Sequence, residues 1–582
     1  MVANLSWLHP FWAFSLPIAL SFPLGWLMFR ALDVPHDRAG RGLDAVPMFL
    51  RRLVGRREPR RMDWKHYASS MLAFNLALFL LTFALLYAQH KIPTLNPDAK
   101  GSLGELGYKV GDDDHPGADT GVVFNTVCSF VTNTNLQHYS GEQHLSYFSQ
   151  LAGIVWLMFV TPASGLCVML ATLRGLRGDK DLGDFYADLM RGIVAVILPY
   201  CLILAVALVG LGVPMTFHGA EKVATLDGAA TKFEQTIARG PVAALVAIKQ
   251  AGTNGGGFFG PNSAHPFENP SPWTNLLSIA SIVMLPMASM VMAGLMLRNM
   301  KHAMVLYGVM LALLVAGAVV AITAEVGPSA AVEGLPVTAG PNMEGKEVRV
   351  GPVAGATWAA MTTATSNGSV NSMHDSLNPV AGAVPMAMMM LNVVFSGVGA
   401  GFENMLMYVI VAVFIAGLMV GRTPEYLGKK VEAKEVKLAM IAVLIHPLLI
   451  CVGAGLFAAT AWGQKTTANP GPHGFSEILY EFTSAAANNG SGFEGLGDNN
   501  PAWNIATGVV LLLGRFPALI LPLAVAGSLS KKKRVPQTTG TLKTDNLTFA
   551  GMLMGTVLLV GALSFMPAVV LGPVADHLAV PK

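Results

Sequence analysis

The sequence predicts an all-α integral membrane protein with ten transmembrane helices, and three observations support this fold class. Hydrophobic residues make up 53% of the 582 positions and charged residues only 13%, and the mean hydropathy is +0.52. A soluble multidomain enzyme of this length would be less apolar. Stretches of about 20 apolar residues, enough to cross a hydrocarbon core about 30 Å thick, recur along the whole chain. We therefore expect one membrane domain and no large soluble domain.

The predicted spans start near residues 8, 69, 145, 191, 272, 303, 379, 438, 502 and 547. The first is too long for the core of a signal peptide and has no basic segment before it, so we expect it to remain as a spanning helix. The segment from Ala31 to Tyr67 contains nine Lys or Arg, and Lys531–Arg534 is similarly basic. By the positive-inside rule both segments are cytoplasmic. By parity, both chain termini are then predicted on the extracytoplasmic side.

Four of the external segments are long, and each contains an apolar stretch that is too short to cross a membrane. Loops of this length usually contain structure or function. We expect each short apolar stretch to form a re-entrant half-helix. The stretches are TGVVFNTVCSFV from Thr120, PVAALVAIKQA from Pro241, GATWAAMTTA from Gly355 and SEILYEFTSAAA from Ser476.

A similar tetrapeptide follows each predicted half-helix. Asn occupies its second position four times, at spacings of 121, 113 and 122 residues along the chain. Such a period indicates a fourfold internal repeat of span, half-helix and span. The tetrapeptides are Thr132-Asn133-Thr134-Asn135, Thr253-Asn254-Gly255-Gly256, Ser366-Asn367-Gly368-Ser369 and Asn488-Asn489-Gly490-Ser491.

The repeat divides the chain into six parts. Residues 1–67 form an additional transmembrane helix and the basic loop, and residues 531–582 form a second additional transmembrane helix. The four repeats lie between them, at residues 68–180, 181–298, 299–430 and 431–530.

Four tetrapeptides around one axis would line a pore for a cation. Non-helical backbone at membrane depth is tolerated only inside protein or beside a watery cavity, and rings of backbone carbonyls replace the hydration shell of potassium. Gly255, Gly368 and Gly490 remove the steric cost of the alternating backbone that such rings need, whereas Thr134 breaks the pattern. Divalent ions favour charged oxygen ligands, and the tetrapeptides contain no carboxylate. We therefore expect a monovalent cation.

The sequence of the seventh span predicts an interrupted helix. Residues 379–421 form a nearly continuous apolar stretch of 43 positions, which would be about 65 Å long as one helix. Two separate spans would reverse every later basic segment, against the positive-inside rule. A single crossing broken at GVGAGFENM, which contains Gly397, Gly399 and Gly401, fits better, and broken helices near the midplane commonly line transport sites. The alternative is a glycine-rich packing site.

Several ionisable residues also suggest roles near a pore. Arg515 lies near a helix centre, which costs about 2.5 to 3.5 kcal/mol on insertion scales, so we expect it to face the bundle interior; snorkelling or pairing with backbone carbonyls is the alternative. His138 and His265 are expected to be structural. Four external carboxylates either concentrate cations at the mouth or are solvated surface charges. They are Glu142, Glu268, Asp375 and Glu494.

Four longer motifs carry a family resemblance that extends from the first span to the last. They are GTNGGGFFGPNSAHPFENP from Gly252, TATSNGSVNSMHDSLNP from Thr363, GRTPEYLGKK from Gly421 and AAANNGSGFEG from Ala485. With them the chain resembles the family of potassium-binding (A) subunits of the bacterial Kdp potassium-transporting ATPase, within the superfamily of potassium transporters.

The resemblance implies four span, pore-loop, span repeats around a central potassium-channel-like filter, with a flanking helix at each end. It implies that Gly255, Gly368 and Gly490 are filter glycines and that the first filter strand lies around residues 133–135. It places Gln137 where the family's potassium affinity is affected. The broken seventh span would obstruct the path below the filter, and Arg515 would lie close to that path.

The resemblance also implies the function and the partners. The chain would bind extracytoplasmic potassium in the bacterial inner membrane and pass it to a P-type ATPase catalytic subunit (KdpB), with small accessory membrane subunits (KdpC and KdpF). This chain has no DKTGT segment for phosphorylation, so we expect no catalytic residues and no ATP site in it. The alternative is a self-sufficient potassium channel or an ion-gradient-driven potassium transporter. A pore-shaped scaffold would not need four aligned glycine-bearing strands.

Overall fold

The computed structural model describes residues 7–33, 61–110, 113–117, 119–179, 181–225, 234–328, 340–536 and 542–579. Within these residues, ten helices are long and apolar enough to cross a membrane, as the sequence predicts. Most of the basic segment between the first two spans lies outside the described residues.

The spans begin close to the predicted positions, except for the seventh, which is interrupted. Their helices are α2 (Leu8–Leu32), α4 (Trp64–Ala88), α7 (Trp156–Arg177), α8 (Phe185–Arg191), α9 (Leu198–Gly210), α12 (Pro272–Met296), α13 (Met300–Val326), α16 (Ala400–Val420), α17 (Ala433–Ala458), α20 (Pro501–Leu529), α21 (Leu547–Val569) and α22 (Ala575–Ala579). Short π-helical turns precede α7 (Ser149–Val155), join α8 to α9 (Gly192–Ile197) and join α21 to α22 (Val570–Val574).

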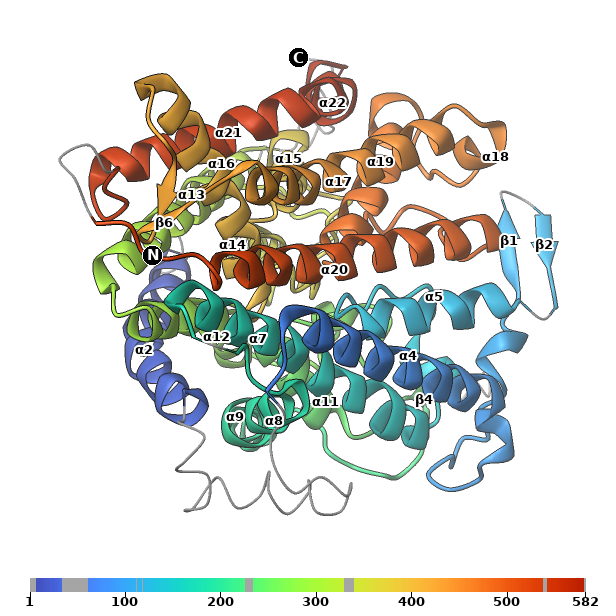
Figure 1. Ribbon diagram of the computed structural model, residues 1–582. Coiled ribbons are helices and arrows are strands. Elements are labelled where there is room, and N and C mark those ends of the chain that lie inside the picture. Colours follow the sequence, from blue (N-terminus) through green and yellow to red (C-terminus); the bar gives the residue numbers. More distant parts are fainter. Residues whose placement is uncertain are drawn as a thin grey trace.

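Four shorter helices lie at the predicted half-helices, and each ends at the residue where its apolar stretch ends. They are α5 (Thr120–Val131), α11 (Val242–Ala251), α14 (Gly351–Ala364) and α19 (Gly471–Ala487). Figure 1 shows α5 and α19 lying alongside the long helix α20. The N-terminal ends of α14 and α19 extend beyond the predicted stretches.

The described residues also contain three small antiparallel hairpins within the otherwise helical fold. They are β1 (Tyr108–Val110) with β2 (Asp113–His115), β3 (Glu221–Ala224) with β4 (Glu234–Ile237), and β5 (Glu425–Tyr426) with β6 (Lys429–Lys430). Their registers pair Tyr108 with His115, Glu221 with Ile237 and Glu425 with Lys430.

The long helices differ strongly in burial. In α12, 89% of the most apolar part is buried within the chain, and in the span that contains α7 the share is 83%. In α17 the share is only 22%, and its Leu444, Leu448 and Val452 are exposed. Since α17 is as apolar as the inner helices, its outer face is suited to lipid or to another apolar helix.

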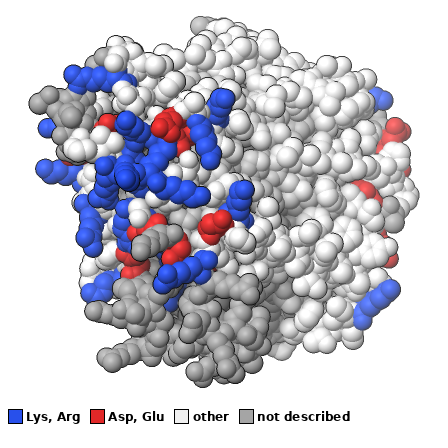
Figure 2. All heavy atoms as spheres, in the orientation of Figure 1, with Lys and Arg blue, Asp and Glu red and all other residues white. Residues whose placement is uncertain are grey.

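Charged residues gather at one end of the helices. Figure 2 shows most Lys and Arg on the side where β6 lies in Figure 1, and a broad band of other residues beside it. Segments predicted on the same side of the membrane meet there: Lys429 Nζ donates to Gly175 O at 2.9 Å, and Arg534 Nη2 donates to Arg177 O at 3.1 Å.

The seventh span breaks earlier than the sequence predicts. Helix α15 (Pro379–Leu391) ends six residues before Gly397, and α16 begins at Ala400, so the non-helical segment is 392–399. Asn392 and Phe395 have positive φ values of 48° and 52°. A break starting at Gly397 is therefore wrong: the chain leaves the helix at Asn392, a residue type that tolerates this conformation, and Gly401 is already helical.

His473, in the first turn of α19, holds together three separate parts of the chain. Its Nε2 lies 3.1 Å from Asp375 Oδ1, and its Nδ1 lies 2.8 Å from Asp576 Oδ2 in α22. Hydrogen bonds to these two carboxylates raise the pKa of His473 to about 10. The raised pKa means that the stabilisation is complete below about pH 6.5, the unfolded value, and is lost as the pH rises through about 10.

We predict that His473→Gln lowers the thermal unfolding temperature of the purified protein at pH 7. Hydrogen bonds to charged groups contribute about 1.5 to 3 kcal/mol, which sets the largest loss expected. The difference from wild type should shrink by pH 10.5, where wild-type His473 is neutral. His577→Gln, at an exposed histidine of α22, is the control. A difference that is the same at both pH values would contradict the charged clamp.

Candidate ion-binding site

The segments that follow the four short helices converge on one place in the membrane domain. At three glycines of these segments, an added Cβ atom would collide with a main-chain oxygen of the next segment. The colliding pairs are Gly255 with Asn367, Gly368 with Asn489 and Gly490 with Thr134. Because only glycine lacks the Cβ atom, any other residue at these positions would displace the neighbouring carbonyl.

Hydrogen bonds join the first segment to the second and complete the ring. Asn133 Nδ2 donates to Thr253 O at 2.9 Å. Four residues further along the chain, Gln137 Nε2 donates to Gly257 O at 3.2 Å, and Gly257 N donates to Gln137 Oε1 at 2.8 Å. The four segments therefore follow one another around the ring in chain order, and Gln137 fixes the outer part of the first segment against the second.

The backbone places the first segment one residue out of step with the alignment based on Asn. Its positive φ values fall on Asn133 (66°) and Asn135 (56°), so Asn135, and not Thr134, has the conformation of the glycines. Thr132 caps the helix, and Leu136 takes the fourth position. Asn is a non-glycine residue that tolerates positive φ. The other three segments have positive φ at Thr253 and Gly255, Ser366 and Gly368, and Asn488 and Gly490.

One backbone hydrogen bond ties each segment to its own short helix. The amide at the second position donates to the helical carbonyl five residues earlier. The pairs are Thr134 with Ser129 (2.9 Å), Asn254 with Lys249 (3.0 Å), Asn367 with Thr362 (2.8 Å) and Asn489 with Ser484 (2.9 Å). These contacts agree with the shifted register of the first segment. They also place the negative helix ends beside the ring, where they favour a cation.

The Asn side chains brace the ring. Asn367 Nδ2 donates to Lys249 O at 2.9 Å and Asn489 Nδ2 donates to Thr362 O at 3.0 Å, in each case at the preceding short helix. Their Oδ1 atoms accept the amides of the fourth-position residues Ser369 (2.9 Å) and Ser491 (3.0 Å). Gly256, at the fourth position of the second segment, lies against Asn135. The four segments contain no carboxylate, so every oxygen that they bring to the ring is neutral.

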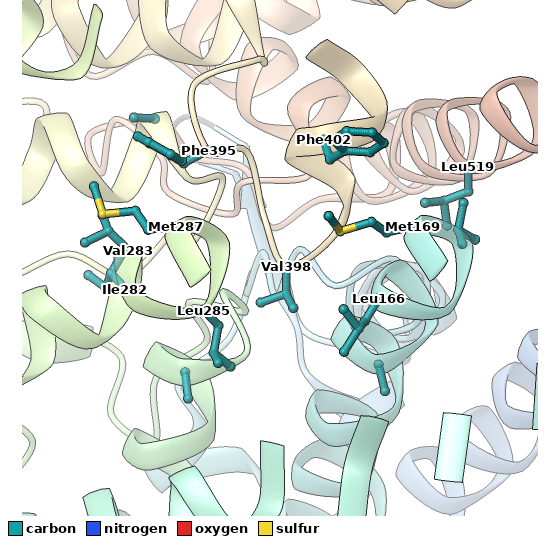
Figure 3. Packing of buried hydrophobic residues seen from close by; sticks show 14 of the residues in the cluster. Leu166, Met169, Ile282, Val283, Leu285, Met287, Phe395, Val398, Phe402 and Leu519 are labelled. Atoms are coloured by element: carbon teal, nitrogen blue, oxygen red, sulfur yellow. The ribbon is translucent and has the colours of Figure 1, made fainter. Parts of the chain in front are cut away.

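The non-helical segment 392–399 lies directly beneath the ring. Val398 N lies 3.4 Å from Thr253 Oγ1, and Gly397 lies beside the same hydroxyl. Gly399, at a φ of 83°, contacts the backbone of Gly165 in α7 so closely that a Cβ atom would not fit. Figure 3 shows Val398 at the tip of this segment, between Leu285 of α12 and Leu166 of α7. Segment 392–399, which we call the plug, thus places the apolar side chain of Val398 under the ring.

Arg515 of α20 is buried beside this plug, and its Nη2 donates to Thr161 O at 3.3 Å. A cavity of about 20 Å³ lies between the plug and the ring, lined by residues including Asn133, Asn488 and Arg515. A second cavity of about 40 Å³ is lined by Asn392 and Asn404 as well. A cation below the ring would therefore meet a guanidinium and polar amides. Asn392 and Asn404 were not predicted, because nothing in their local sequence marks them.

The four external carboxylates form internal contacts. Glu268 pairs with Lys249 and is fully buried, and Glu494 Oε2 accepts His374 N at 2.8 Å. Asp375 pairs with His473, and Glu142 accepts an amide at 3.0 Å from the second segment's loop. The reading as a solvated surface charge is wrong for Glu268, which is fully buried and accepts the backbone amides of Phe258 and Phe259. Glu494 is exposed, although it accepts the backbone amide of His374.

His138 lies behind the first segment and is also buried. Burial lowers its pKa, but the carboxylates of Asp498 and Glu481 outweigh burial and raise the pKa of His138 to about 9. The ring is thus surrounded by buried polar groups on its outer side.

Comparison with known proteins identifies a family whose profile matches nearly the whole chain. The profile described as potassium-transporting ATPase A subunit matches residues 12–578. Three similar proteins are each named potassium-transporting ATPase potassium-binding subunit. That of Geobacillus kaustophilus is 46% identical over 570 residues, which cover 97% of this chain and 98% of the relative. That of Pseudomonas aeruginosa is 46% identical over 559 residues (96% and 96%), and that of Alicyclobacillus acidocaldarius is 45% identical over 569 residues (96% and 97%).

We predict that Gly368→Ala weakens monovalent cation binding while Asn135→Gly leaves it close to wild type. An alanine at the φ of 92° of Gly368 costs about 1 to 2 kcal/mol, which corresponds to a loss of about 5- to 30-fold. Displacement of Asn489 O adds to this loss. Glycine adopts the backbone of Asn135 without cost. Calorimetric titration of the purified protein with potassium chloride measures both.

Gly555→Ala in α21, where a Cβ atom would meet open space, is the control for that experiment. Equal weakening by Asn135→Gly and Gly368→Ala would contradict the backbone register described above.

Proposed function

The chain belongs to the family of potassium-transporting ATPase A subunits, and from this premise we propose that it binds potassium in the ring and passes it to an ATP-driven partner. The chain is a multi-pass membrane subunit of a potassium-transport system. The ligands proposed for potassium are the main-chain carbonyls of residues 133–136, 253–256, 366–369 and 488–491.

The observation that carries this proposal is the approach of one main-chain oxygen to the glycine of the adjacent segment at three of the four junctions. Fixed neutral oxygens in rings are what a dehydrated potassium ion requires. The absence of any carboxylate in the four segments disfavours a divalent ion as cargo. Gln137 would act on affinity through its two hydrogen bonds to Gly257, since it holds the outer end of the ring together.

We further propose that segment 392–399 and Arg515 prevent straight conduction. The plug formed by Val398 lies under the ring, and the guanidinium of Arg515 repels a cation that leaves it. The cavity that contains Asn392 and Asn404 lies to one side of the plug, so a sideways exit toward a partner is supported. The obstruction favours a pump subunit over the alternative, a self-sufficient potassium channel or an ion-gradient-driven transporter.

The proposed location is the bacterial cytoplasmic (inner) membrane, with both termini on the extracytoplasmic side. The meeting of Lys429, Arg534 and Arg177 at one end of the bundle supports a cytoplasmic assignment for that end. The ring would then open to the external side. The proposed partners are a P-type ATPase catalytic subunit and small accessory membrane subunits, and ATP would be hydrolysed in the partner.

We predict that proteoliposomes containing this chain with its P-type partner and accessory subunits accumulate potassium only when ATP is supplied. The chain alone should not accumulate it, because the energy source lies in the partner. Radioactive-tracer uptake measures both preparations, with a non-hydrolysable ATP analogue as the control. Accumulation by the lone chain without ATP would favour the alternative transporter.

A separate prediction concerns the plug. Deletion of residues 397–402 should produce a passive potassium current in planar bilayers, because it removes Val398 from beneath the ring. Val398→Gly keeps the backbone and should produce a smaller current. Both currents should prefer potassium over sodium, since the ring is unchanged. If neither variant conducts more than wild type, the segment is not the barrier.

A further inference from the structure

Three ionisable side chains from distant parts of the chain meet behind the first segment of the ring. His138 follows that segment, Glu481 lies in α19, and Asp498 precedes α20. His138 Nε2 lies 3.4 Å from Glu481 Oε1 and 3.6 Å from Asp498 Oδ2. The side chains of His138 and Glu481 are 0% and 1% exposed, and that of Asp498 is 29% exposed. The group of three side chains is therefore shielded from solvent except at Asp498.

The orientation of the imidazole follows from its second nitrogen. His138 Nδ1 lies 2.7 Å from Asn504 Oδ1. The amide of Asn504 is fixed because its Nδ2 donates to Asp119 Oδ2 and Asn499 Oδ1, both at 3.3 Å. Asn504 Oδ1 can only accept, so Nδ1 carries the hydrogen. When a metal ion displaces the second proton, Nε2 of His138 faces the two carboxylates with its lone pair, as in metal sites where the ligating histidine donates its other N–H to an oxygen.

Glu481 provides an independent indication that this group binds a cation. Its Oε2 is buried and has no hydrogen-bond partner among the described residues. A buried carboxylate oxygen without a partner is costly. The same carboxylate faces His138 through Oε1, so a cation bound beside His138 would also neutralise Glu481.

The distances fit a shared metal ion better than direct hydrogen bonds. The separations of 3.4 and 3.6 Å exceed the usual range of about 2.7 to 3.2 Å for N–H···O bonds. Two ligands of a tetrahedral zinc ion, each about 2.0 to 2.2 Å from the metal, lie roughly 3.4 Å apart. One imidazole and two carboxylates also cancel the charge of a divalent ion, which matters at a buried site.

We propose that His138, Glu481 and Asp498 form a binding site for a divalent transition-metal ion, with zinc as the metal that fits best. Imidazole favours zinc and its neighbours over calcium or magnesium. Three protein ligands leave a fourth position for water, and Asp498 borders an external cavity of about 560 Å³ through which the ion would enter. The ion would join the first segment to α19 and so fix two neighbouring quarters of the ring.

The test uses the complete complex, stripped of metal and titrated with zinc chloride. We expect one zinc ion per chain at this site, and zinc-edge X-ray absorption should show one imidazole nitrogen among oxygen ligands. His138→Ala should remove this binding, and Glu481→Gln should weaken it at least tenfold. His218→Ala, at an exposed histidine, should retain it.

The absorption spectrum of the wild-type complex does not depend on how well the variants fold. No stoichiometric zinc, a shell without imidazole, or binding that survives His138→Ala would overturn the proposal. In that case a protonated His138 between the two carboxylates would account for the group. Potassium uptake by the same preparations is a separate measurement, so failure of the zinc site does not affect the proposed function.

Discussion

A cation that loses its water inside a membrane domain needs oxygen ligands that are fixed before it arrives, and the surroundings of the four segments follow from this requirement. Main-chain carbonyls meet it only if the chain leaves the helical conformation, which at membrane depth requires burial in protein. Asn254, Asn367 and Asn489 are accordingly fully buried. Their backbone amides donate to carbonyls of their own short helices, and the side chains of Asn367 and Asn489 fasten each segment to the preceding short helix. The long helices hold this assembly in place.

The ring is regular, but the contacts behind it are not. The second segment is held by Lys249 Nζ, which donates to Asn262 Oδ1 at 2.7 Å, while Asn262 Nδ2 donates to Gly255 O at 2.6 Å. Behind the third segment, Trp358 Nε1 donates to Ser369 O at 2.8 Å. Behind the fourth, Tyr480 OH lies 2.8 Å from both Ser491 Oγ and His374 Nδ1. Each quarter thus has its own support, and the quarters differ in stiffness and in charge.

Much of this arrangement is predictable from the sequence, because it depends on local patterns. The ends of the short helices are predicted correctly, because the apolar stretches end at the same residues, Val131, Ala251, Ala364 and Ala487. The glycines at the third place of three tetrapeptides also predict the positive φ found there. The first segment is misaligned because Asn133 looks like the second-place Asn of the other segments but takes the first place, and nothing in the sequence shows that Asn135 takes the place of a glycine. The break at Asn392 is missed for a similar reason, since Asn392 and Phe395 adopt positive φ without a glycine. Contacts such as that between His138 and Glu481 join residues far apart in the chain and have no local signal.

The four carbonyl-bearing segments belong to one polypeptide, whereas a channel assembled from four identical chains repeats each residue around its axis. In such a tetramer, a single codon change alters every quarter at once, so small adjustments are hard to make. Here a change at Asn135 or Gln137 alters one quarter and leaves three intact. Carrying all four segments on one chain therefore permits selection to tune ion affinity in fine steps, one side of the axis at a time.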